Sequence, residues 1–404
     1  MTALPVIIAE TPSVERGEEA LAFVPVYARF PLEIVRGEGT RLFDAGGRSY
    51  LDFTSGIGVN ALGYNDPGIA GAARRALESG VLHTSNLFHT APARKLAEAL
   101  VARSFASSVF FCNSGAEANE GAFKFARKWA RGVGGAEKHE IIALRGGFHG
   151  RLFATLAATD RPHYRAPFRP LAGGIAIAER DIGELSRMLD AETAAAVIVE
   201  PVQGEGGVRV LEASFLSALR KLTHERNVAL IFDEVQCGLG RTGWLFAYER
   251  ADVVPDVVTL AKPLAGGLPM GAILVNAEIA AAMRPGDHGS TFGGGPFIAT
   301  VAAHVFERLS DSALLARVRE NGSWLGESLR ALSARREEIR AVRGAGYLWG
   351  IDVTRPAGEI VAAAREAGLL ILTAGDYTLR LLPPLTATRE ELAHGLSLLE
   401  KSLS

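Results

Sequence analysis

The chain has 404 residues and a mass of 42.8 kDa, with 48% hydrophobic residues, 22% charged residues and 45 glycines. This profile excludes a mini-protein and a disordered chain, and it predicts a compact protein, since domains usually hold about 100–200 residues. With 43 Lys and Arg against 45 Asp and Glu, the net charge of −2 provides no broad positive field for nucleic acid or an anionic membrane. A small-molecule partner is therefore favoured.

Residues 24–60 carry short strand-like stretches separated by Glu-Gly and Gly-Gly turns, which predict hairpins. From about residue 105 to 280, short apolar runs alternate with helical patterns, which predicts a parallel or mostly parallel sheet covered by helices. The strands expected there are 108–112, 140–144, 194–200, 228–234, 256–261 and 271–276. After about residue 297, we expect helices, strands within 342–353 and 369–384, and a closing helix from Arg389.

These elements predict an α/β protein with two domains. The large domain would span 61–296 and contain the mostly parallel central sheet flanked by helices. The smaller α+β domain would combine residues 1–60 with residues 297–404. No internal repeat is evident in the sequence.

The cellular compartment is indicated by two features of the sequence. The only cysteines are Cys112 and Cys237, too few for a disulfide framework, which favours a reducing, cytoplasmic location. Residues 1–20 lack the basic start and long apolar core of a secretory signal. No apolar run approaches the roughly 18–20 residues that cross a bilayer. We therefore expect neither export nor membrane insertion.

An anion site is predicted where the strand FFC runs through Asn113, Ser114 and Gly115 into an amphipathic helix. Backbone N–H groups at a helix start and the helix dipole favour a phosphate there, and glycine permits close approach of the ligand. Alternatively, Ser114 serves only as the N-cap of the helix, with Glu117 completing a capping box.

A carboxylate and a lysine follow two further strands. Asp233 ends the run VALIFD, at the edge of the sheet where open α/β folds bind ligands, although it could equally cap the next turn. Lys262 follows DVVTLA in an apolar, glycine-rich stretch, where partial burial would make it an amine nucleophile, although most lysines are solvated surface groups. No His or Cys cluster with metal-ligand spacing accompanies them, so no metal is predicted. Together, the phosphate site, the acid and the lysine match the three needs of pyridoxal phosphate.

Seven motifs resemble those of the class III aminotransferases, which belong to the fold-type I pyridoxal phosphate enzymes. They occur in order along nearly the whole chain: NSGAEANE, FHGR, EPVQGEGG, DEVQCGLGRTG, AKPLAGGLPMGA, HGSTFGG and LRLLPP. Within the class, the run HTSNL and the general course of the sequence are most similar to the acetylornithine aminotransferases.

The resemblance implies a role for each residue of a cofactor site. Lys262 would hold pyridoxal 5'-phosphate and shuttle the proton during the reaction. Asp233 would pair with the pyridine nitrogen, Gln236 would bind the phenolic oxygen, and Val235 and Phe148 would face the two sides of the ring. Three residues at the start of the predicted helix would bind the phosphate: Ser114, Gly115 and Ala116.

The resemblance also implies how two substrates share one site. Arg151 would bind the carboxylate far from the reacting amine, and Arg380 would bind the α-carboxylate of glutamate. Glu205 would pair with Arg380 when an ω-amine is bound and swing away for glutamate. Thr291 would reach the phosphate in the neighbouring subunit, with Ser290 near that subunit's substrate, so the active enzyme would be a homodimer.

The function implied is transfer of the δ-amino group of N2-acetyl-L-ornithine to 2-oxoglutarate, giving N-acetyl-L-glutamate 5-semialdehyde and L-glutamate, a step of arginine biosynthesis. Other donors stay open: succinylornithine, ornithine, 4-aminobutyrate or a lysine presented on a carrier protein. Gly56 stands where ornithine aminotransferases carry a tyrosine, which leaves room for an acylated amine.

Two other classes of function remain as alternatives. A non-catalytic binding protein on the same fold would be expected to lack the lysine, the aspartate or the arginines, all of which are present. A different pyridoxal phosphate reaction, such as racemisation or decarboxylation, does not need the pair of Arg380 and Glu205. Fold alone does not decide among these functions.

Overall fold

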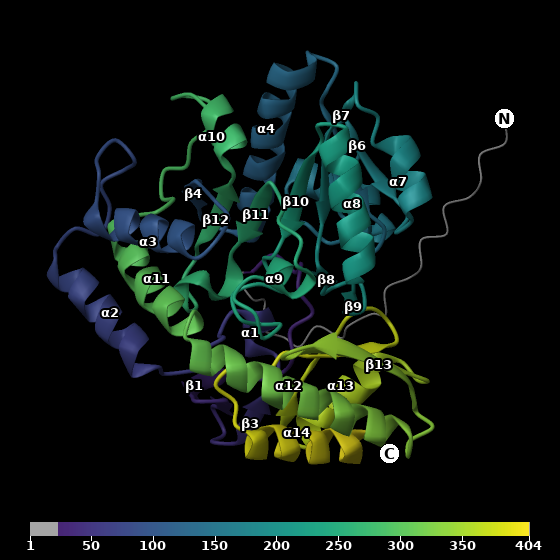
Figure 1. The fold of residues 1–404 in the computed structure, drawn as a ribbon. Helices are drawn as coiled ribbons and strands as arrows, with labels where there is room; N and C mark the ends of the chain where they lie inside the picture. The colour runs from purple at the N-terminus through teal and green to yellow at the C-terminus, as the bar shows by residue number, and fades with distance from the viewer. Residues whose placement is uncertain (1–22, 404) are drawn as a thin grey trace.

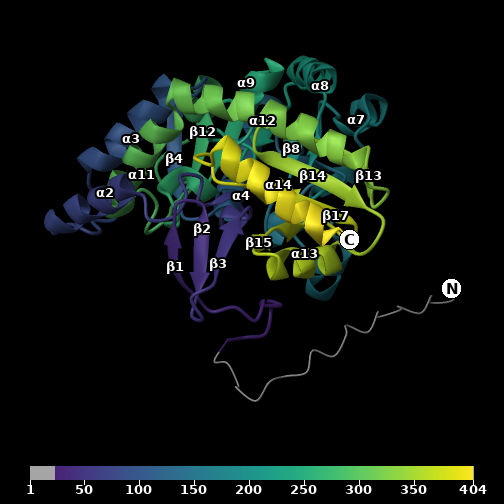
Figure 2. The same cartoon turned by 90° about the horizontal axis from the view of Figure 1, so that it is seen from below.

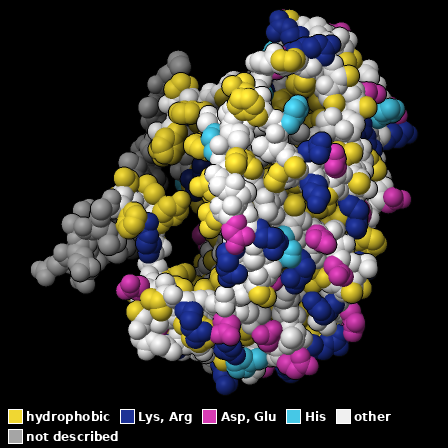
Figure 3. All heavy atoms as spheres, turned by 90° about the vertical axis from the view of Figure 1, so that its left-hand side faces the viewer, with side chains coloured by type: hydrophobic (Ala, Val, Ile, Leu, Met, Phe, Trp, Pro, Cys, Tyr) yellow, Lys and Arg dark blue, Asp and Glu magenta, His cyan; other side chains and the backbone are white. Residues whose placement is uncertain are grey.

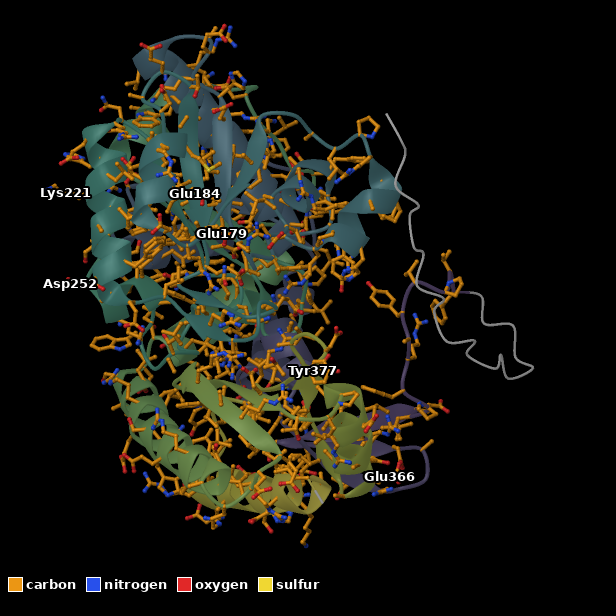
Figure 4. The ribbon with its side chains drawn as sticks, turned by 90° about the vertical axis from the view of Figure 1, so that its right-hand side faces the viewer. Glu179, Glu184, Lys221, Asp252, Glu366 and Tyr377 are labelled. Carbon is orange, nitrogen blue, oxygen red and sulfur yellow. The ribbon has the colours of Figure 1, made fainter. Side chains whose placement is uncertain are left out.

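The computed structural model describes residues 23–403. The prediction that residues 1–20 are not a secretory signal concerns residues outside this range. The central strands and their helices form the upper part of the molecule in Figure 1, and the C-terminal helices and strands form the lower part. In the side view of Figure 4, Glu179 and Glu184 lie in the upper part, and Glu366 lies in the lower part.

A seven-stranded sheet forms the centre of the upper part, with the strand order β4-β12-β11-β10-β7-β5-β6. Only β12 runs antiparallel to its neighbours, so the predicted mostly parallel sheet is confirmed. The strands are β4 (Ser108–Cys112), β5 (Glu140–Leu144), β6 (Ile175–Ala178), β7 (Ala194–Val199), β10 (Ala229–Asp233), β11 (Val257–Leu260) and β12 (Gly271–Val275). The edge strand β6 was not predicted, since four residues reading IAIA carry no distinct period.

Both faces of this sheet are covered, which explains its unbroken apolar strands. Successive residues of β10 alternate between two apolar clusters. Ile231 packs in the cluster formed with α4 (Gly115–Gly134), and Leu230 and Phe232 pack in the cluster that contains the buried leucines of α8 (Ala213–Glu225). The period of two along the strand thus sends alternate side chains to opposite helical layers.

The lower part contains a second, antiparallel sheet in the order β13-β14-β17-β16. Its strands are β13 (Ile339–Ala345), β14 (Leu348–Val353), β16 (Leu372–Thr373) and β17 (Thr378–Leu381). The helices associated with it are α12 (Ser312–Ser333), α13 (Ala357–Glu366) and α14 (Arg389–Ser402). The capping box of α14, in which Thr388 and Glu391 bond each other's backbone N–H, starts the closing helix where the sequence predicts it.

The first strands of the described chain join this C-terminal part (Figure 2). The predicted hairpins are present as antiparallel β1 (Ile34–Glu38), β2 (Arg41–Asp44) and β3 (Ser49–Asp52). In the same sheet, β3 pairs in parallel with β15 (Leu369–Leu370), through Leu51 opposite Leu369. Segments from the two ends of the described chain therefore share one sheet.

A helical layer beside the central sheet is formed by α2 (Pro67–Glu78), α3 (Ala91–Ala102) and α11 (Pro296–Leu309), which pack together. The short elements are α1 (Ser55–Gly58), α5 (Phe153–Ala157), α6 (Pro162–Arg165), η1 (Ala166–Phe168), α7 (Ile182–Met188), β8 (Val202–Gln203), β9 (Arg209–Val210), α9 (Ala247–Ala251), η2 (Lys262–Ala265) and α10 (Ala277–Ala282). Within residues 23–403, no helix has the length and apolar character needed to span a membrane.

Candidate active site

A cavity of about 420 Å³ opens at the carboxyl ends of the parallel strands. The segments that follow β4, β7, β10 and β11 all reach it, because strands that run in one direction end at the same edge of the sheet. Ten of the predicted site residues line this cavity: Ser114, Gly115, Ala116, Phe148, Arg151, Glu205, Asp233, Val235, Gln236 and Lys262.

The start of α4 forms one wall of the cavity. Ser114 is the N-cap of this helix, and its Oγ accepts a hydrogen bond from the backbone N–H of Glu117 at 3.2 Å. The Glu117 carboxylate accepts from the backbone N–H of Asn113 at 2.6 Å, so the predicted capping box is shifted by one residue. A cap uses an acceptor of Ser114 and leaves its O–H donor available. Capping and anion binding are therefore compatible at this helix start.

Gly115 is required by close packing against the segment after β10. A Cβ placed on Gly115 would lie 2.6 Å from Cγ1 of Val235, which is closer than carbon atoms approach. The bare backbone lets Val235 pack directly against the helix start, and a ligand in the cavity that both residues line can reach the first N–H groups of α4.

Asp233 ends β10 with its side chain facing the cavity and only 3% of the residue exposed. Its Oδ2 accepts hydrogen bonds from Nδ2 of Asn119 at 2.7 Å and from Nδ1 of His149 at 2.8 Å. Its Oδ1 accepts from the backbone N–H of Val235 at 3.0 Å. Since a carboxylate only accepts, His149 carries its proton on Nδ1. No Lys or Arg in residues 23–403 lies within ion-pair distance of this carboxylate, so it can stabilise a cationic group of a ligand.

Lys262 follows β11 and starts the short helix η2 with a left-handed φ of 36°. Left-handed backbone is unfavourable for a residue with a side chain, and such strain is typical of functional positions. Burial lowers the pKa of the Lys262 amine, the charge of Asp233 opposes this, and the charge of Arg380 lowers the pKa further. A neutral amine, the form that acts as a nucleophile, is therefore more accessible than for a surface lysine.

Arg380 lies on β17 of the second sheet and is 3% exposed. Its Nη1 lies 2.7 Å from Oε1 of Glu205 and donates to Oε1 of Gln236 at 3.1 Å. Glu205 is more accessible than its partner, with 32% of its side chain exposed. The two parts of the molecule thus meet at this ion pair, beside the cavity that Glu205 and Gln236 line.

Arg151 lines the same cavity but has a different environment. Its guanidinium lies 3.3 Å from the ring centre of Tyr164 and 5.9 Å from that of Phe148. Within the described part of the chain, no carboxylate lies within ion-pair distance of Arg151. The cavity therefore presents one arginine that can accept an anion, Arg151, while the arginine beside it, Arg380, is already paired with Glu205.

Ser290 and Thr291 do not line this cavity. Thr291 lines a second cavity of about 290 Å³, together with residues 83–86. Ser290 connects the two regions, because its Oγ accepts from Nδ2 of Asn113 at 3.2 Å and Asn113 lines the first cavity.

Three polar residues of the site were not predicted: Asn119, His149 as a partner of Asp233, and Glu200. Glu200 directly follows β7, and Asp233 ends the neighbouring strand β10. Ligands bind at the carboxyl ends of such strands, so the argument that identifies Asp233 applies to Glu200 as well. Its two carboxylate oxygens accept from the backbone N–H groups of Phe148 at 2.9 Å and Gly204 at 3.1 Å. Burial raises the pKa of Glu200 to about 7, against the opposing effect of His149.

These residues fit the predicted pyridoxal 5'-phosphate. The start of α4 with bare Gly115 suits a phosphate, Asp233 offers a buried negative charge, and Lys262 offers an amine of lowered pKa in the same cavity. Gln236 uses its Oε1 toward Arg380, which leaves its amide N–H donors for an oxygen of the ligand.

Comparison with known proteins agrees with this assignment. The family described as "Aminotransferase class-III" matches residues 23–403. The acetylornithine aminotransferase of Methanocaldococcus jannaschii is 44% identical over 368 residues, which cover 91% of this chain and 92% of that protein. The mitochondrial acetylornithine aminotransferase of Alnus glutinosa is 44% identical over 385 residues, which cover 94% of this chain and 85% of that protein.

Solved structures are similar over nearly their full length. The N-acetylornithine aminotransferase of Stenotrophomonas maltophilia K279a matches with a TM-score of 0.81 at 38% identity, covering 93% of this chain and 96% of that chain. The ornithine aminotransferase of Toxoplasma gondii ME49 matches with a TM-score of 0.90 at 31% identity, covering 95% of this chain and 92% of that chain.

Proposed function

The chain belongs to the class III aminotransferases, which depend on pyridoxal phosphate, and we propose that its donor is N2-acetyl-L-ornithine and its acceptor 2-oxoglutarate. The products are N-acetyl-L-glutamate 5-semialdehyde and L-glutamate, in arginine biosynthesis. The observation that carries this proposal is a pair of unequal arginines: Arg151 lines the cavity and is open to an anion, and Arg380 lies beside the cavity, held by Glu205. Such a cavity suits one substrate with a single distal carboxylate and another with two carboxylates.

When bound, the cofactor supplies an aldehyde that accepts the amino group and a ring that stores the electron pair released at the reacting carbon. Ser114, Gly115 and Ala116 hold its phosphate at the start of α4. The negative charge of Asp233 would keep the ring nitrogen protonated, and the hydrogen bonds from Asn119 and His149 hold the carboxylate in place.

Lys262 acts both as the residue that holds the cofactor and as the base of the reaction. Its lowered pKa makes the neutral amine available to take a proton from the substrate carbon and to return it later. Phe148 and Val235, which both line the cavity, would contact the two faces of the ring and orient it.

The donor binds while Glu205 occupies Arg380. Arg151 then takes the donor carboxylate, and the ion pair keeps the charge of Arg380 neutralised beside the donor. For 2-oxoglutarate, Arg151 takes the distal carboxylate, and Glu205 turns outward so that Arg380 binds the α-carboxylate. The greater exposure of Glu205 gives it room for this movement.

The match to an ornithine aminotransferase has the higher TM-score of the two structures compared, so ornithine is the second candidate donor. Backbone similarity does not report on the donor, however. At Gly56, φ is 59°, and a Cβ would lie 2.9 Å from Nδ2 of Asn60. A tyrosine at this position would be strained, so the space beside Val59, which lines the cavity, stays open for an acyl group.

We further propose a homodimer in which Thr291 reaches the phosphate of the partner's cofactor. Figure 3 shows hydrophobic side chains gathered toward one edge of the face that carries α2 and α3. Among the exposed apolar residues are Phe292, next to Thr291, and Leu87 and Phe88 near the second cavity. Burial of these side chains would stabilise a dimer. The domain boundaries and the cytoplasmic location stay predictions.

An absorption spectrum of the purified protein with cofactor, before and after addition of N2-acetyl-L-ornithine without a keto acid, tests the proposed donor. Loss of the visible band is expected, as the amino group passes to the cofactor. A band that ignores acetylornithine but responds to ornithine or 4-aminobutyrate would make the proposed donor wrong. Absence of a band after reconstitution would contradict the role of Lys262.

A further inference from the structure

The guanidinium of Arg151 lies over the ring of Tyr164, a contact that the motif around Arg151 does not predict. The centre of its guanidinium is 3.3 Å from the ring centre of Tyr164, which is the contact distance of two stacked planes. A stacked guanidinium keeps its N–H groups in the plane, pointing away from the ring. The ring thus fixes the plane in which Arg151 can bind a carboxylate through two parallel hydrogen bonds.

The helix that carries Tyr164 is itself held in place. At the start of α6, Arg161 donates from Nη1 to the carbonyl of Asp160 at 2.8 Å and from Nη2 to the carbonyl of Glu205 at 2.5 Å. The carbonyl of Arg161 in turn accepts from the backbone N–H of Tyr164 at 3.0 Å. The ring of Tyr164 is therefore attached, within one helical turn, to the loop that holds the partner of Arg380.

We propose that Tyr164 is a positioning residue that determines specificity for substrates with a distal carboxylate. Its ring holds the Arg151 guanidinium with an N–H edge toward the cavity, in reach of the carboxylate of either substrate. The proposal rests on the proposed function in one respect, namely that Arg151 binds a carboxylate. It adds a residue that touches neither substrate nor cofactor and acts only through Arg151.

The proposal predicts an effect confined to ligands with a distal carboxylate. In Tyr164→Leu the π face is lost while apolar bulk remains, so Arg151 becomes free to rotate. Binding then weakens by about two- to thirtyfold, the range of a cation–π contact. Tyr164→Phe keeps the face and is expected to bind as the wild type does. Phe168→Leu removes an exposed aromatic four residues further on and serves as the matched control.

The test uses the enzyme loaded with cofactor and two readouts. Calorimetry with glutarate, a dicarboxylate without an amine, measures anion binding whatever the true donor is. Single-turnover absorbance with N2-acetyl-L-ornithine and with butylamine, which has no carboxylate, separates the apparent dissociation constant from the limiting rate. For Tyr164→Leu we expect weaker glutarate and acetylornithine binding, an unchanged limiting rate and unchanged butylamine binding.

The proposal is overturned if Tyr164→Leu binds glutarate as tightly as the wild type, or if butylamine binding weakens equally, which would indicate a structural defect. Should the leucine variant not fold, Tyr164→Met tests the same expectation. A wild type that binds glutarate but does not react with acetylornithine would refute the proposed donor alone, and the effect of Tyr164 on glutarate would still decide this inference.

Discussion

Removal of the charge of Glu205 is expected to tighten the binding of glutamate. In the structure, Oε1 of Glu205 lies 2.7 Å from Nη1 of Arg380, so an incoming α-carboxylate must displace it. In Glu205→Gln, an amide oxygen can still accept one hydrogen bond, but the opposing charge is gone. The competition for Arg380 is thereby weakened, while Arg151 is left unchanged.

The size of the effect follows from the burial of the two partners. A hydrogen bond to a charged group contributes about 1.5–3 kcal/mol net. Arg380 is buried, but the Glu205 side chain is 32% exposed, so solvent screening lowers the contribution of the pair to about 1–2 kcal/mol. Since about 1.4 kcal/mol corresponds to a factor of ten, the apparent dissociation constant of glutamate should fall by about 5- to 30-fold.

Single-turnover absorbance with glutamate and, separately, with N2-acetyl-L-ornithine measures this change. Acetylornithine binding should not tighten, because its carboxylate is assigned to Arg151 and Glu205 no longer neutralises Arg380 beside it. Glu212→Gln removes an exposed carboxylate seven residues further on and controls for the change of net charge. Unchanged or weaker glutamate binding in Glu205→Gln would refute the assignment of Arg380 as the site of the α-carboxylate.

Three further substitutions give expected outcomes. Lys262→Ala should remove the visible absorption band and lower turnover by at least about 10²–10⁴-fold. Lys221 is exposed, and Lys221→Ala should change neither. A Lys262→Ala variant that retains turnover would exclude Lys262 as the base. Gly115→Ala should weaken cofactor binding, measured by equilibrium dialysis, because its Cβ would lie 2.6 Å from Val235. Relieving this overpacking costs about 1–3 kcal/mol. A Cβ on Gly132 meets open space, so Gly132→Ala should leave cofactor binding unchanged. Burial raises the pKa of Glu234 from 4.5 to about 8, so its neutral form stabilises the fold below pH 4.5 and this contribution is lost as pH rises to about 8. The unfolding free energy of the wild type minus that of Glu234→Gln, from urea titrations, should therefore fall between pH 5 and 8, and a constant difference would contradict the raised pKa.

Short-range patterns in the sequence predict the central sheet and four residues of its cavity: Ser114, Gly115, Asp233 and Lys262. Six further cavity residues are expected only from the resemblance to a known family: Ala116, Phe148, Arg151, Glu205, Val235 and Gln236. Apolar runs identify the strands, and the residue after each run reaches the sheet edge, as with Asp233 and Lys262. The same rule identifies Glu200, which directly follows β7. Asn119 could be found from its place on the buried face of α4.

Other features depend on contacts between distant segments, which no local pattern encodes. The contact between Tyr164 and Arg151 joins α6 to the segment before α5, and neither helix is long enough to show a period. The separation of Thr291 from the main cavity likewise depends on how residues 83–86 pack beside it.

The parallel pairing of Leu51 with Leu369 also affects how the chain is made. About 320 residues separate these partners, so β3 leaves the ribosome long before β15 is synthesised. At roughly 5–20 residues per second, the first strands wait about 15–60 s for the segment that completes their sheet. The central sheet, whose strands all precede Ala277, can form during this interval. Arg380 arrives after it, so the ion pair with Glu205 beside the cavity forms only in the last stage of synthesis.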